Sequence, residues 1–133
     1  MKTKAVLTIR ETTQILQAAR AEAEKNNWPV AIAVVDDGGH LLGMLRLDGG
    51  APISAQIAVE KARTSALGRR ESRLYEEMIN GGRAAFLSAQ LKGALEGGVP
   101  VLVNGEIVGA VGVSGVKPEQ DAQTAKAGAV AIS

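Results

Sequence analysis

Four side chains have the types and positions expected of a binding or catalytic site, namely His40, Arg46, Lys61 and Arg69. His40 is the only histidine, and an imidazole can ligate a metal or a haem iron, or act as an acid or base near neutral pH. His40 also follows Asp-Asp-Gly-Gly, a sequence typical of turns, so a polar turn residue is the competing interpretation.

The two carboxylates before this turn, Asp36 and Asp37, are the second group with possible chemistry. Carboxylate oxygens are the ligands that hard divalent cations prefer. Aspartates before a Gly-Gly pair are also typical of turns, where the side chain binds nearby backbone N–H groups. The sequence leaves both interpretations open.

Positive charge is concentrated in the middle third of the chain, at Lys61, Arg63, Arg69, Arg70, Arg73 and Arg83. Glutamates are interleaved with these residues, so ion pairs on a solvated face are one interpretation. The other is an anion site for a carboxylate or a propionate-bearing cofactor, because a guanidinium binds a carboxylate through two parallel hydrogen bonds. Lys61 follows Ile53 and Ile57 on one side of a predicted helix, which favours a partly buried side chain with its ammonium near a cleft.

Several other classes of site do not fit the sequence. The glycines of residues 109–115 have the spacing G-x-x-G-x-x-G and lie within a predicted strand, which argues against a dinucleotide site. Neither a Ser-His-Asp order nor an HExxH motif is present. The absence of cysteine excludes disulfides, thiolate metal sites and a cysteine nucleophile.

Composition predicts one domain over residues 1–133. The net charge of +1 and the three aromatic residues argue against nucleic-acid binding. No stretch approaches the roughly 20 apolar residues of a membrane span, and the start lacks an apolar segment of signal-peptide length. We therefore expect a soluble cytoplasmic protein with no nucleic-acid or membrane partner.

Two hairpins are predicted to position the candidate residues. Residues 97–115 read as two buried strands joined by Asn104-Gly105, a pair that favours the type I′ turn. Residues 30–35 and 40–47 read as a second hairpin, in which Gly43 indicates a bulge or a close approach. Arg46 lies between Leu45 and Leu47, so it faces the opposite side of its strand from both.

The remaining elements are predicted to be mainly helical. Thr8 and Glu11 form a capping box before a helix over residues 9–25, and Pro118 suits the first turn of the last helix. We also expect a short strand at 4–7, a helix at 52–67 and a short polar helix at 71–79, whereas residues 83–95 show only weak periodicity. Strands joined by tight turns are antiparallel, so the fold class is α+β around one mostly antiparallel sheet.

The helix at 52–67 is apolar on two sides. Its alanines form one stripe, and Ile53 and Ile57 lie on roughly the opposite side. A helix of this kind needs two covers. We expect the sheet to be one and a neighbouring subunit of a homo-oligomer to be the other.

An ordered set of segments spans nearly the whole chain, at residues 34–42, 46–48, 60–64, 97–100, 112–115 and 119–121. This set resembles the GlcG/HbpS family, which also supplies the C-terminal domain of PduO-type proteins. The resemblance implies a profilin-like, three-layer α/β/α fold with a five-stranded antiparallel sheet, and homo-oligomers. It also implies haem as a possible cofactor, because some relatives bind haem, and His40, Arg46 and Lys61 occupy motif positions of the family.

Three functions follow, in this order of preference. The first is an oligomeric accessory protein of a glycolate- or diol-utilisation type of catabolic operon that binds a small anionic ligand or a tetrapyrrole such as haem. The second is an enzyme acting on a small carboxylate, with Lys61 or His40 as base and Arg46 or Arg69 as anchor. The third is a structural partner in a larger complex. The sequence leaves open whether any reaction is catalysed.

Overall fold

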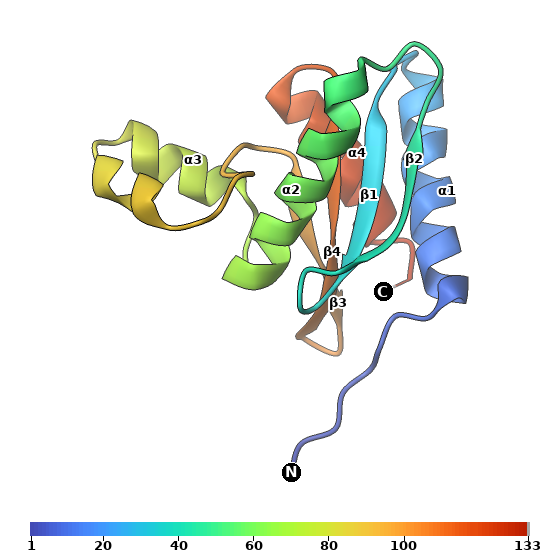
Figure 1. The fold of residues 1–133 in the computed structure, drawn as a ribbon. Helices are drawn as coiled ribbons and strands as arrows, with labels where there is room; N and C mark the ends of the chain where they lie inside the picture. The colour runs from blue at the N-terminus through green and yellow to red at the C-terminus, as the bar shows by residue number, and fades with distance from the viewer. Residues whose placement is uncertain (133) are drawn as a thin grey trace.

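The computed structural model describes residues 1–132 as three layers, with a four-stranded antiparallel sheet between helices (Figure 1). The strand order is β2-β1-β4-β3, so the two hairpins lie side by side and β1 pairs with β4. The strands are β1 (Ala31–Asp36), β2 (Leu41–Arg46), β3 (Gly98–Val103) and β4 (Glu106–Ser114). The helices are α1 (Ile9–Lys25), α2 (Pro52–Gly68), α3 (Arg73–Asn80) and α4 (Pro118–Ala129), with a 3₁₀ turn η1 (Ala84–Ser88).

Both predicted hairpins are confirmed. Asn104 and Gly105 have φ values of 51° and 77°, as a type I′ turn requires. The register of β1 against β2 shifts between Val34 and Val35, where Val34 pairs with Gly43 and Val35 with Leu41. The bulge predicted from Gly43 therefore lies beside it, and the bare backbone of Gly43 packs against α1.

The sheet has four strands, so the prediction of five was wrong. The predicted strand at residues 4–7 does not form either. Only Leu7 of that segment is buried, and the side chains of Lys2 and Lys4 bind Glu106 at the start of β4 and Asp37 in the β1–β2 turn. Side-chain ion pairs hold this part of the chain against the body without a backbone ladder. The profilin-like likeness stays a prediction.

Local sequence signals predicted the starts of the helices correctly. The Thr8 N–H donates to Glu11 Oε1 at 2.8 Å, which confirms the capping box of α1. Pro52 and Pro118 stand in the first turns of α2 and α4, where a missing N–H costs nothing. Residues 83–95 contain η1, which contacts α3 in an arm that projects from the body (Figure 1).

Small residues let α2 pack very closely on one face of the sheet. Ala58, Ala62 and Ala66 are fully buried against small side chains of β1 and β4. Gly98 and Gly112 pair across β3 and β4. A Cβ atom on Gly98 would lie 2.2 Å from the Lys61 carbonyl oxygen, and one on Gly112 would lie 2.0 Å from the Ala58 carbonyl oxygen. These contacts leave no room for a methyl group. The helix backbone therefore lies directly on the sheet backbone.

The other face of the sheet carries a more ordinary apolar core. Its β1 and β4 members are Ile32, Val34, Val111 and Val113, and α1 and α4 cover them. The outward side of α2 has little cover within the described residues, since Ile53 is 63% exposed. The predicted homo-oligomer thus remains untested by the single chain.

The close contact between Gly112 and α2 leads to a prediction about stability. Gly112→Ala should destabilise the fold by about 1–3 kcal/mol, because the added methyl must push α2 away from the sheet. Gly38→Ala is the matched control, since its Cβ meets no atom closer than 3.4 Å. Urea unfolding followed by circular dichroism measures both. Equal midpoints for the two variants would contradict the close packing.

Candidate functional site

His40 ends the turn between β1 and β2, and its side chain is exposed. Asp36 explains the turn, because its Oδ1 accepts hydrogen bonds of 2.9 Å from the N–H groups of Gly38 and His40. Asp36 therefore has the turn role that was one of its two interpretations. The imidazole itself is presented to solvent by a rigid turn.

Arg69 lies beside the same turn because α2 ends there. Its φ of 57° is left-handed, a conformation that favours glycine and costs a residue with a side chain about 1 kcal/mol. Its Nη1 donates to the Asp37 carbonyl oxygen at 2.6 Å and to the Ala66 carbonyl oxygen at 3.0 Å. The helix end thus holds a fixed guanidinium next to the turn that carries His40.

Apolar side chains flank this turn. Leu67 of α2 lies against Gly39, where a Cβ atom would be 3.4 Å from Leu67 Cγ. Leu41 follows His40 at the start of β2 and is 50% exposed. Leu41 and Leu67 give the turn an exposed apolar surface, which we call the leucine shelf. An imidazole, a guanidinium and the leucine shelf are therefore close together.

A pocket of 580 Å³ opens at this end of the molecule. It is lined by Lys2, Lys4, Arg69, Gly105, Glu106 and Ile107. Lys2 binds Glu106 at 3.2 Å and Lys4 binds Asp37, and the hydrogen bond from Lys4 holds the pKa of Asp37 below its usual value. Three cations thus stand against two carboxylates, which leaves a net positive site.

Sequence reasoning missed Lys2 and Lys4. The only signal was the basic start of the chain, Met-Lys-Thr-Lys, which was not interpreted as part of a site. Nothing in the local sequence indicates that residues 1–4 reach the β3–β4 turn. Their place follows from the tertiary structure alone.

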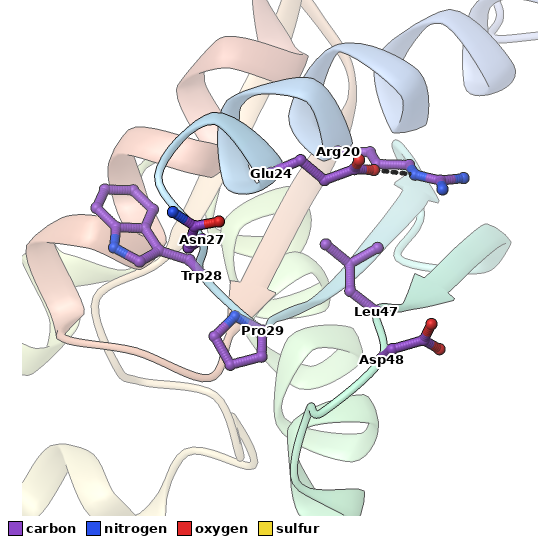
Figure 2. Close-up of a pocket in the computed structure, with 7 residues that line it drawn as sticks. All are labelled: Arg20, Glu24, Asn27, Trp28, Pro29, Leu47 and Asp48. Atoms are coloured by element: carbon purple, nitrogen blue, oxygen red, sulfur yellow. Dashed lines mark hydrogen bonds and ion pairs between the residues drawn. The ribbon is translucent and has the colours of Figure 1, made fainter.

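Arg46 lies away from His40. It pairs with Ala31 at the start of β1, whereas His40 follows the end of β1, and the length of β2 separates the two by about 17 Å. The pocket at that end, of 450 Å³, is lined by Arg20, Glu24, Asn27, Trp28, Pro29, Leu47 and Asp48 (Figure 2). There Arg20 is bound by Glu24, and Asp48 adds a second carboxylate, so this pocket suits an anion poorly.

Lys61 is buried, not at a cleft, with 4% of its surface exposed. Its Nζ donates at 3.0 Å to Asp121 Oδ2 of α4 and at 3.0 Å to the Val113 carbonyl oxygen. Burial raises the pKa of Asp121, and the Lys61 ammonium and backbone N–H groups oppose that rise. Val113 pairs with Ile32 near the start of β1, so the structure does not bring Lys61 and His40 together.

Two other findings concern metal sites and membrane spans. Among residues 1–132, no group of three or more histidine, cysteine or acidic side chains is arranged to hold a metal ion. No helix in the same part of the chain is long and apolar enough to cross a membrane. The site at the His40 turn consists of one imidazole, three cations, the carboxylates of Asp36, Asp37 and Glu106, and an apolar surface.

A family model described as haem degrading protein HbpS-like matches residues 7–130. The chain belongs to this HbpS-like family. It is also 60% identical over 114 residues to Protein GlcG of Escherichia coli (strain K12), covering 86% of this chain and 85% of GlcG. The resemblance predicted from the ordered segments is therefore confirmed.

Two solved structures agree with the family assignment. The crystal structure of HbpS is 30% identical, with a TM-score of 0.89 over 100% of this chain and 94% of the HbpS chain. The crystal structure of a PduOC:heme complex is 25% identical, with a TM-score of 0.86 over 96% of each chain. The family and its fold are thus established for this chain.

The buried pair makes a second stability prediction. Lys61→Met should destabilise the protein by about 3–5 kcal/mol, because it leaves Asp121 buried without its cation. Asp121→Asn should also destabilise, since the buried Lys61 ammonium then has no carboxylate to balance its charge. The double variant should lose less free energy of unfolding than the two single variants lose together, by at least about 1 kcal/mol. Strictly additive losses in urea unfolding would contradict the coupling.

Proposed function

We propose that this protein binds a tetrapyrrole, with haem as the first candidate, at the end of the molecule where α2 meets the β1–β2 turn. The observation that carries the proposal is that Arg69 both lines the positive pocket and binds the Asp37 carbonyl oxygen of the turn that ends at His40. These are the groups that an anionic ligand with a metal centre would use. The proposed role is that of an accessory protein in a catabolic operon of the glycolate- or diol-utilisation type.

The residues present fit haem. The exposed imidazole of His40 would bind the haem iron, and Asp36 holds the backbone of His40 in place. The leucine shelf of Leu41 and Leu67 suits the apolar face of a porphyrin. Arg69 and the lysines would pair with its propionates. Haem, when bound, supplies an iron centre for ligand or redox chemistry.

The comparisons support the proposal through the relatives. One structural neighbour is a complex with haem, and the family description refers to haem degradation. We propose haem binding for this chain, and the proposal does not include haem degradation. Lys61 is not part of the proposed site, because its ammonium is held by Asp121 in the interior.

The site makes a binding prediction. Haem added to the wild-type protein should give a saturable Soret shift, and His40→Ala should weaken it by removing the axial nitrogen. Arg69→Gly should also weaken binding while the fold keeps its stability, since glycine adopts the left-handed φ of 57° without strain. Visible absorbance titration measures the affinity, and urea unfolding checks the fold.

Arg46→Ala tests the alternative location. Arg46 lies at the other end of β2, so its loss should leave the haem affinity nearly unchanged. A loss of affinity in Arg46→Ala, with His40→Ala unaffected, would move the site to the Arg46 end of β2, where the pocket of Figure 2 also lies. No saturable shift in the wild type would reject haem.

We also propose that the protein is cytoplasmic and forms a homo-oligomer, and the exposed Ile53 on the outward side of α2 supports the homo-oligomer. Sedimentation velocity should give a species larger than the 13.7 kDa monomer. Ile53→Glu should shift it towards the monomer, because the new charge would be buried in the contact. A wild-type monomer at micromolar concentration would contradict this proposal.

A further inference from the structure

The segment before α1 is attached to the body in an unusual way. Leu7 is buried in the core, where it contacts the bare backbone of Gly109, but Val6 and the residues before it are exposed. The described segment runs down from α1 without regular secondary structure (Figure 1). Beyond Leu7, it is held through the two lysine ion pairs that line the positive pocket.

These two ion pairs are easily exchanged. The Lys2 side chain is 76% exposed and Glu106 31%, whereas Lys4 and Asp37 are each 36% exposed. Ion pairs in such solvated positions contribute little, because water screens the attraction and long side chains lose freedom. Arg69 differs, since two carbonyl oxygens hold its guanidinium in place. The pocket thus combines one fixed cation with two movable ones.

From this arrangement we propose that residues 1–6 form a strap over the pocket, and that Lys2 and Lys4 exchange Glu106 and Asp37 for a carboxylate of the ligand. The fixed guanidinium of Arg69 receives the carboxylate first, and the lysines then close on it. Glu106 and Asp37 compete with the ligand for the strap. This inference rests on the proposed location of the binding site, and it adds the ligand group that is recognised and the segment that closes.

Competition predicts opposite effects for the two partners of one ion pair. Lys2→Gln should lower the haem affinity by about two- to fivefold, and Glu106→Gln should raise it by a similar factor, because it frees Lys2. Haem dimethyl ester, in which both propionates are blocked, should respond to neither change. Equal responses of haem and its ester would overturn the carboxylate assignment.

A matched pair controls for the change in net charge. Glu22 and Lys25 on α1 form an ion pair of the same 3.2 Å length, with side chains 17% and 71% exposed, and lie outside the lining of this pocket. Glu22→Gln and Lys25→Gln should leave the affinity unchanged at 0.15 M salt, because charges beyond a Debye length of about 8 Å are screened. Effects equal to those at Glu106 and Lys2 would overturn the proposal.

Trypsin reports the strap directly, and succinate separates this inference from the haem proposal. Cleavage after Lys4 should slow when haem or succinate binds wild-type protein, and an unchanged rate with a bound ligand would overturn the closure. If haem fails to bind but succinate binds with the predicted Lys2→Gln and Glu106→Gln effects, the strap stands and its carboxylate source is a small free acid. Failure of both ligands to bind would overturn the strap.

Discussion

The close contact between α2 and the sheet determines the geometry on which the rest of this structure depends. Gly98 and Gly112 are paired across β3 and β4, and the carbonyl oxygens of Lys61 and Ala58 lie where their side chains would be. This contact sets the height of α2 above the sheet. The end of α2 therefore reaches the β1–β2 turn, where Leu67 meets Gly39 and Arg69 binds the Asp37 carbonyl oxygen.

A buried ion pair joins the same helix to α4. Lys61 reaches past the end of β4 to Asp121, so α2 and α4 are joined although they cover opposite faces of the sheet. Breaking such a pair leaves an uncompensated charge in the interior, which is more costly than a lost surface contact. The residue that seemed the sharpest candidate for chemistry thus stabilises the scaffold, and the candidate site lies at the helix end instead.

Much of the fold could be predicted because its signals are local. Asn104-Gly105, the Thr8–Glu11 capping box and Pro118 each act within a few residues, and each was confirmed. The partner of Lys61 lies 60 residues away, so no local pattern reveals it. The position of Arg46 was within reach of sequence reasoning, since a tight hairpin places the last residues of its second strand far from the turn that carries His40. The five-stranded sheet followed from the resemblance and from the strand predicted at residues 4–7, but no such strand forms there, and Lys2 and Lys4 instead bind Glu106 and Asp37 through their side chains.

The central claim is that the ligand binds where the end of α2 meets the β1–β2 turn, and the iron of ferric haem provides the most direct test. Paramagnetic iron broadens the amide signals of nearby residues, and glycines at both ends of the molecule have well-separated nitrogen shifts. In a ¹H–¹⁵N spectrum, haem should broaden Gly38, Gly39 and Gly105 and leave Gly49 and Gly50 sharp. Broadening of Gly49 and Gly50, with Gly39 and Gly105 unaffected, would contradict the account.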